Sequence, residues 1–234
     1  MNVLLTSATS ARGRTVAEGI NGSHHLRLTD RQNAVLEGEY AVSPLNHDKS
    51  TNLLVRGMDA LIVAGEPLPD ESTPSYIDAM TRGLYNLLMA AYEEQVKRVV
   101  YLSTLDLVMA YGPEYIVTER WRPRPTPEPH LLGKHLGEYV CREFAREHKL
   151  SVVVLRLGKV VDAAEVAGQP VDPVWLDKRD LGAAVLGALT ATLPQWSVIH
   201  VQGKQANARF PIGDAEKLIG FVPSVDFSVP AHMH

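Results

Sequence analysis

The chain has 234 residues, 45% of them hydrophobic, and a formal net charge of −4 at pH 7. This length can bury a sizeable core in one domain or in one domain with a small lobe. Charges of both signs are mixed along the sequence without a basic block, which argues against a nucleic-acid surface.

No apolar run is as long as a membrane span, and a strand-like segment begins within two residues of the start, so we expect neither a membrane segment nor a signal peptide. Cys141 is the single cysteine, which excludes an intrachain disulfide and fits a reducing cytoplasm. We therefore expect a cytoplasmic protein.

Short apolar runs alternate with helical stretches along the chain. The runs predict strands at 3–6, 25–30, 60–65, 98–103, 152–157 and 198–203, and apolar residues spaced by three and four predict helices at 77–94, 131–147 and 180–193. Segment 112–129 has five prolines, too many for a helix or a central strand, and predicts a loop at the lip of a site. The alternation predicts an α/β fold with a doubly wound, mostly parallel sheet of six or seven strands, in the central order 3-2-1-4-5-6.

Three segments in the middle of the chain carry a family resemblance. The run 98–103 leads into Ser103-Thr104, the next helix opens with His130-Leu131-Leu132-Gly133-Lys134, and the strand after it closes with Leu155-Arg156-Leu157-Gly158. This order resembles the extended short-chain dehydrogenase/reductase family, the NAD-dependent epimerases and dehydratases, which have a Ser/Thr run, Tyr-x-x-x-Lys and Leu-Arg-x-Gly at these places. The lysine is present as Lys134, and His130 stands where the family has tyrosine.

The first strand-to-helix turn reads Thr6-Ser7-Ala8-Thr9-Ser10-Ala11-Arg12-Gly13, against the family's Thr-Gly-x-x-Gly-x-x-Gly. Glycines there provide a tight turn, close approach to the pyrophosphate and close helix packing. Gly13 keeps the packing glycine, while Ser7 and Ser10 occupy the turn and phosphate positions. A Cβ at Ser10 would crowd a diphosphate, although its hydroxyl, the helix N-terminus and Arg12 could still hold an anion.

Two further segments match the outline of a nucleotide site. The second strand ends in Asp30-Arg31, where the family meets the adenosine ribose, and Asp30 favours NAD because a carboxylate repels a 2′-phosphate. Arg31 could instead attract that phosphate, so both NAD and NADP remain open. The fourth strand ends in the small residues Ala64-Gly65, across which the resemblance lets a cofactor lie.

The catalytic centre is where the chain departs most from the family. The resemblance implies a tyrosine whose pKa of about 10 is lowered by a neighbouring Lys⁺ and the cofactor. His130 and Lys134 are four apart and share one helical face, but a nearby Lys⁺ disfavours an imidazolium. His130 could still relay a proton as a base. The family's hydroxyl falls on Leu105 in strict register, and a one-residue slip restores Thr104, so Ser103 and Thr104 are both candidates.

After Gly158 the resemblance implies a long substrate-binding segment, but here only 159–174 precedes a typical helix start near Asp180. We therefore expect a dinucleotide-binding core at 1–158 and, at 159–234, the end of the sheet with a contracted substrate lobe, suited to a small ligand. The histidines, including His24, His25, His232 and His234, lack metal-ligand spacing, so no metal site is expected.

Two hypotheses follow. In the first, the chain is an NAD(P)-binding relative with reduced or lost catalysis and a binding or regulatory role. In the second, it is an active NAD(P)-dependent oxidoreductase or epimerase on a small substrate that uses His130 and Lys134. The family also implies a homodimer through the helices at 77–94 and 131–147, where Met89, Tyr92, Leu131 and Tyr139 extend the apolar surface.

Overall fold

The computed structural model describes residues 1–205 and 208–228, so His232 and His234 lie outside it. Its main sheet has seven strands in the order β3-β2-β1-β4-β5-β6-β9, and every pairing is parallel. The strands are β1 (Asn2–Leu5), β2 (His25–Asp30), β3 (Glu39–Val42), β4 (Ala60–Val63), β5 (Arg98–Thr104), β6 (Ser151–Leu157) and β9 (Trp196–Val201). The predicted fold class and central strand order are confirmed.

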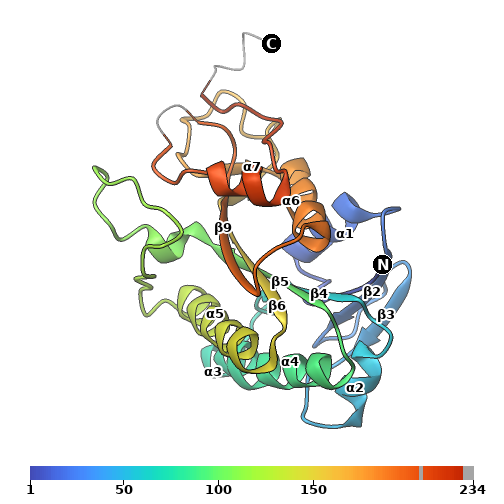
Figure 1. Cartoon of the computed structure of the whole chain (residues 1–234). Helices are drawn as coiled ribbons and strands as arrows, with labels where there is room; N and C mark the ends of the chain where they lie inside the picture. The colour runs from blue at the N-terminus through green and yellow to red at the C-terminus, as the bar shows by residue number, and fades with distance from the viewer. Residues whose placement is uncertain (206–207, 229–234) are drawn as a thin grey trace.

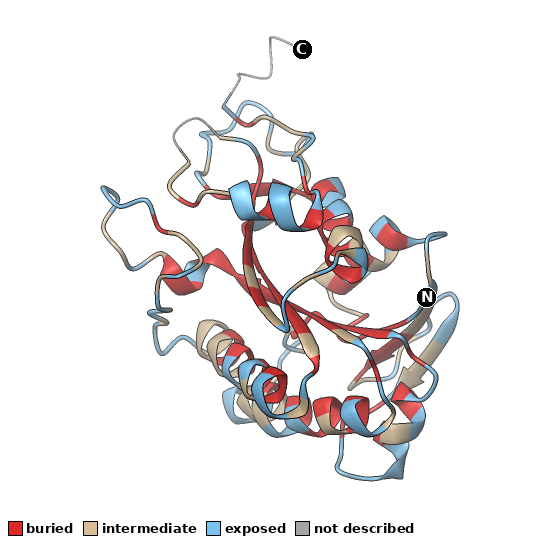
Figure 2. Ribbon diagram, viewed as in Figure 1, coloured by how far each residue is buried: buried red, intermediate tan, exposed pale blue. Residues whose placement is uncertain are grey.

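Helices cover both faces of this sheet (Figure 1). One face carries α1 (Ala11–Ile20), α6 (Lys178–Thr190) and α7 (Gly213–Ile219), and the other carries α2 (Lys49–Val55), α3 (Thr73–Asp78), α4 (Leu84–Glu93) and α5 (Pro129–His148). Successive strand residues point to opposite faces, so Val152 and Val154 join the α4–α5 core while Val153 joins the α1–α6 core. The central strands β1, β4, β5 and β6 are therefore buried on both sides, as Figure 2 shows, whereas the edge strand β3 is not.

The helix predicted at 77–94 is confirmed, but it begins earlier, at Thr73, and contains a π-helical turn η1 (Ala79–Gly83) between α3 and α4. Two glycines let α5 pack closely beside this helix: a Cβ at Gly133 would lie 2.5 Å from the Tyr76 ring, and one at Gly137 would lie 2.1 Å from the Tyr101 hydroxyl. The start of α5, which carries Lys134, is thus held tightly against the sheet and against α3.

Outside the main sheet and its helices, the chain forms one short 3₁₀ turn, an irregular stretch and a small second sheet. A 3₁₀ turn η2 (Leu105–Val108) follows β5, and the proline-rich stretch before α5 contains no helix or strand, as predicted. The strands β7 (Lys159–Val161) and β8 (Trp175–Asp177) pair in a separate two-stranded parallel sheet. Cys141 is buried in α5. Among the described residues, no helix combines the length and apolar character needed to span a membrane.

Candidate functional site

The side chain of Lys134 lies fully buried beneath the carboxyl ends of β4 and β5. Its Nζ donates to the carbonyl oxygens of Ala64 at 2.5 Å and Leu102 at 2.9 Å, and to Glu66 Oε1 at 2.8 Å. Burial lowers the pKa of Lys134 to about 8, although the Glu66 carboxylate acts in the opposite direction. All three ammonium hydrogens are therefore used by protein acceptors.

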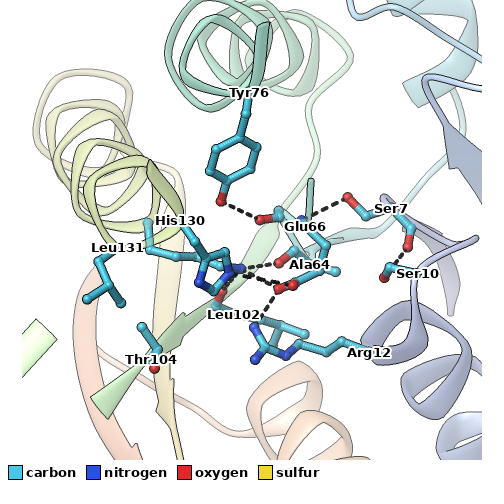
Figure 3. Close-up of polar contacts among 12 residues, drawn as sticks. Ser7, Ser10, Arg12, Ala64, Glu66, Tyr76, Leu102, Thr104, His130 and Leu131 are labelled. Carbon is cyan, nitrogen blue, oxygen red and sulfur yellow. Dashed lines mark hydrogen bonds and ion pairs between the residues drawn. The ribbon is translucent and has the colours of Figure 1, made fainter. Parts of the chain in front are cut away.

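Glu66, which directly follows Ala64-Gly65, is the centre of the polar cluster in Figure 3. Besides Lys134, its carboxylate contacts Arg12 Nη1 at 2.5 Å and His130 Nε2 at 3.5 Å. Burial acts to raise the pKa of Glu66, but Lys134, His130 and Arg12 outweigh it and hold that pKa well below its ordinary value. A carboxylate surrounded by three basic side chains thus occupies the sheet edge.

His130 stands in the family's tyrosine position, at the first turn of α5. Its Nε2 faces Glu66, and its ring stacks on Tyr76 with centroids 6.1 Å apart. From the sequence, Lys134 is the only charged neighbour expected for His130, and it disfavours an imidazolium. In the structure a carboxylate, that of Glu66, also faces the imidazole ring, so the charge of Lys134 alone does not describe the surroundings of His130.

Tyr76 brings a phenol to the same place from α3. Its hydroxyl donates to the Gly65 carbonyl at 3.1 Å. Burial, followed by the charge of Glu66, raises the pKa of this phenol far above its ordinary value. Tyr76 therefore acts here as a neutral hydrogen-bond donor that supports the Gly65 backbone.

The turn between β1 and α1 is tight, although serines stand at two of the positions where the family has glycine. Ser7 takes the left-handed conformation that favours glycine, with φ of 51°, and its Oγ accepts from the Glu66 amide. Ser10 caps α1: its Oγ accepts from the Gly13 amide at 2.9 Å and donates to the Ser7 carbonyl at 2.7 Å. A Cβ at Gly13 would lie 2.2 Å from the Ser7 oxygen, so this position requires glycine.

Asp30 ends β2 beside the same turn. Its carboxylate accepts from the Thr9 amide at 3.0 Å, the Thr9 hydroxyl at 2.5 Å and the Arg31 amide at 2.8 Å. The Arg31 guanidinium is turned to Glu71 and contacts both carboxylate oxygens. Asp30 and Arg31 border a narrow pocket of about 30 Å³ that Ser7 and Gly65 also line, and an adenosine would need these walls to move apart.

Ser103 and Thr104 point in different directions because neighbouring strand residues face opposite sides of a sheet. Ser103 Oγ donates to Glu138 Oε1 at 2.6 Å, within a buried network in which Arg156 also pairs with Glu138. Thr104 borders the cleft and donates to Asp106 Oδ2 at 2.9 Å. Of the two hydroxyls, that of Thr104 is the one beside the candidate site.

A cleft of about 820 Å³ extends from Arg12 and Glu66 past Thr104 to β7 and the start of α6. It offers the space in which a ligand could meet the polar cluster. Glu66, Tyr76 and Thr9 were not predicted from the sequence as site residues. Glu66 carried a usable signal, because a charged residue directly after the carboxyl end of a buried parallel strand lies where such folds bind ligands. Among the described residues, no group of three or more His, Cys, Asp or Glu side chains is arranged to hold a metal ion.

A doubly wound parallel sheet with a polar cluster at its carboxyl edge defines a nucleotide-binding class of fold. Residues 5–170 match the sequence model of the NAD dependent epimerase/dehydratase family, and the chain belongs to this family.

Characterised relatives include the L-arabinose 1-dehydrogenase (NAD(P)(+)) of Haloferax volcanii, 23% identical over 82% of this chain and 84% of that protein. The uronate dehydrogenase of Pseudomonas syringae pv. tomato is 25% identical over 76% of this chain and 66% of that protein. A mutant uronate dehydrogenase of Agrobacterium tumefaciens, solved in complex with NAD, shares the fold, with a TM-score of 0.82 and 18% identity over 96% of this chain and 85% of that one.

Proposed function

We propose that this chain binds a nicotinamide dinucleotide along the carboxyl ends of β1, β4 and β5 and acts as an NAD(P)-dependent oxidoreductase on a small sugar. The observation that carries the proposal is the contact of Glu66 with Arg12, His130 and Lys134 at the edge of the cleft. The two characterised relatives, which are dehydrogenases of a sugar and of a sugar acid, support the same reaction class.

The residues present fit the dinucleotide at several points. Gly13 keeps the close packing of α1 on the turn, and Arg12 lies at the start of α1, where a diphosphate gains most from the helix N-terminus. Asp30 faces the turn, and Arg31 is engaged by Glu71, which supports NAD over NADP. When bound, the nicotinamide supplies the hydride acceptor.

His130 takes the role of the acid/base in this proposal. A sugar hydroxyl that is oxidised to a carbonyl gives its proton to the imidazole, and Glu66 stabilises the resulting imidazolium. Thr104, at the rim of the cleft, orients that hydroxyl. Lys134 keeps Glu66 in position, because its ammonium donates to the Glu66 carboxylate and is itself fixed by two backbone carbonyls.

Dinucleotide binding without turnover is the second candidate function. Two observations favour it: Leu105 stands where strict register expects the family's hydroxyl, and the Tyr76 phenol, with its raised pKa, is not placed to replace the missing tyrosine as a proton acceptor. On this hypothesis the chain senses a dinucleotide or presents it to a partner.

Titration calorimetry with NAD⁺, NADH, NADP⁺ and NADPH tests the binding common to both candidates. We expect binding with NAD forms favoured, and weaker binding in Arg12→Ala. Lys217→Ala is the control, since Lys217 is an exposed cation on α7 and lies outside the residues that line the cleft. No heat with any of the four dinucleotides would contradict the proposal. Binding without oxidation of any sugar or sugar acid would select the second candidate.

We also propose that the protein is a homodimer through α4 and α5. Tyr85, Tyr92 and Tyr139 are 46–55% exposed on these adjacent helices, and Met89 is half-buried between them and the core. Tyr85 meets the buried Phe144 edge to face, and the tilted ring of Tyr92 contacts His148, so aromatic side chains of α4 contact those of α5. A contiguous aromatic patch of this kind is typical of an interface.

A further inference from the structure

The large cleft is acidic. Five carboxylates line it but only three basic side chains do so, among the residues that the structure describes. The cleft walls come from α1, η2, β7, the loop after β7 and the start of α6. Glu66 is balanced by Arg12 and by the buried Lys134, so the negative charge that a ligand meets comes from the other carboxylates of the cleft.

Each of the three basic side chains already has a carboxylate partner within the cleft wall. Arg12 contacts Glu66 at 2.5 Å, and Lys178 contacts Asp162 at 2.5 Å. Lys159 lies 3.9 Å from Asp172 and is largely exposed, so its charge is also screened by solvent. A ligand carboxylate or phosphate would have to compete with these partners to gain a counter-ion.

The two remaining carboxylates, Asp106 and Glu165, have no basic partner in the cleft. Asp106 accepts the Thr104 hydroxyl through Oδ2, and Glu165 is exposed on the loop after β7. Ionised carboxylates are strong acceptors for hydroxyl groups, whereas they repel another carboxylate. This arrangement suits a neutral ligand that has many hydroxyls.

We infer that the substrate is a neutral aldose and that sugar acids are disfavoured by the charge of the cleft. The inference rests on the proposed oxidoreductase function and names its substrate class. One of the two characterised relatives acts on L-arabinose and the other on a uronate, and the cleft charges place this chain with the first kind of substrate.

The test compares matched pairs of sugars that differ only in a carboxylate, D-galactose with D-galacturonate and D-glucose with D-glucuronate, together with L-arabinose. Formation of NADH gives kcat/KM for each. We expect kcat/KM to be at least about tenfold higher for the neutral member of a pair, a difference that shrinks in 0.5 M NaCl because salt screens the acidic cleft.

A charge-reversal variant tests the physical cause. Glu165→Lys places a cation on the cleft wall at an exposed position. It should lower the ratio of kcat/KM for the aldose to kcat/KM for the uronate by about tenfold. Glu216→Lys is the matched control: it makes the same change in net charge on the exposed face of α7, outside the residues that line the cleft. In this control the ratio of kcat/KM for the aldose to kcat/KM for the uronate should equal that of the native protein.

The possible results distinguish an error in the substrate class from an error in the proposed oxidoreductase function. Higher kcat/KM for the uronate than for the aldose in the native protein overturns this inference and leaves the proposed oxidoreductase intact. Equal shifts in Glu165→Lys and Glu216→Lys also overturn it, because the cleft charge would then not select the substrate. Oxidation of none of these sugars overturns the proposed oxidoreductase and the inference together.

Discussion

Lys134 Nζ and Glu66 Oε1 lie 2.8 Å apart, although the two residues are 68 positions apart in the chain. The lysine comes from α5 and is fully buried, whereas the glutamate follows β4 and is 16% exposed at the edge of the cleft. The pair links the helix that carries the family's lysine to the strand end across which the family's cofactor lies. Binding, stability and pH dependence should therefore all depend on this one contact.

Glu66→Gln should destabilise the protein. The substitution leaves the Lys134 ammonium buried with neutral acceptors, and breaking a buried pair in this way lowers the free energy of unfolding by about 3 kcal/mol. Urea denaturation at pH 7 measures the change. Glu39→Gln is the control: the Glu39 carboxylate pairs with Arg27 but is 44% exposed. Its removal should lower the free energy of unfolding by less than about 1 kcal/mol. An equal loss in the two variants would show that the buried pair contributes nothing beyond a surface ion pair.

The same carboxylate predicts a loss of stability in acid. The pKa of Glu66 is lowered in the folded protein, so the unfolded chain binds its proton first as the pH falls below the ordinary value of 4.5. The stabilisation is therefore present above that pH and is lost progressively below it. Glu66→Gln should have a flatter stability profile than the native protein between pH 5 and 3, a window of about two units. Parallel profiles would contradict the prediction.

Dinucleotide affinity should fall as the pH rises through about 8, because burial lowers the pKa of Lys134 to about 8. Below pH 8 the Lys134 ammonium balances the charge of the Glu66 carboxylate. Above it, Arg12 is the permanently charged partner left to Glu66, and the carboxylate repels the diphosphate of the dinucleotide. Calorimetric titrations with NAD⁺ from pH 6.5 to pH 9.5, a span chosen to bracket this pKa, measure the effect. In Glu66→Gln the fall should be much smaller. An affinity that is independent of pH in the native protein would rule this coupling out.

Asp30→Ala should narrow or reverse the preference for NAD over NADP, because the carboxylate that repels a 2′-phosphate is removed. Since Asp30 also accepts hydrogen bonds from Thr9 and Arg31, the variant should lose about 1–3 kcal/mol of stability, which thermal unfolding checks separately. Equal binding of NAD⁺ and NADP⁺ by the native protein, unchanged in Asp30→Ala, would remove Asp30 from the site.

The native protein should have the mass of a dimer in light scattering at micromolar concentration. Tyr139→Glu places a charge on the aromatic surface of α5 and should yield monomers. Tyr115→Glu is the control, because Tyr115 is similarly exposed but lies in the irregular stretch before α5. A native monomer mass that persists on concentration would contradict the dimer.

The fold was predictable because the central strands and the longest helices left periodic apolar patterns in the sequence. The edge strand β3 and the shorter helices α1, α2 and α7 left weaker patterns and were not predicted. In the stretch 77–94, the π-helical turn Ala79–Gly83 shifts the helical register without changing the apolar composition. The opposite directions of Ser103 and Thr104 were also within reach, since Ser103 must face the same side of β5 as Tyr101.

The polar cluster was only half predictable. His130, Lys134 and Arg12 were found by comparison with family motifs, but Glu66 fell outside those motifs and its partners come from two distant helices, α1 and α5. Such a contact depends on how closely α5 approaches the sheet, which is set by the small residues Gly133 and Gly137. The effect of Glu66 on His130 could therefore not be derived from the spacing of His130 and Lys134 alone.

If the chain is a dehydrogenase, His130, whose ring faces Glu66, is the residue expected to take the proton of the sugar hydroxyl. The rate of NADH formation with L-arabinose or D-galactose as substrate measures this step. His130→Ala should lower kcat by about 100-fold or more, and His130→Tyr, which restores the family's residue, should keep more activity than His130→Ala. A native rate retained in His130→Ala would show that His130 does not perform the proton transfer.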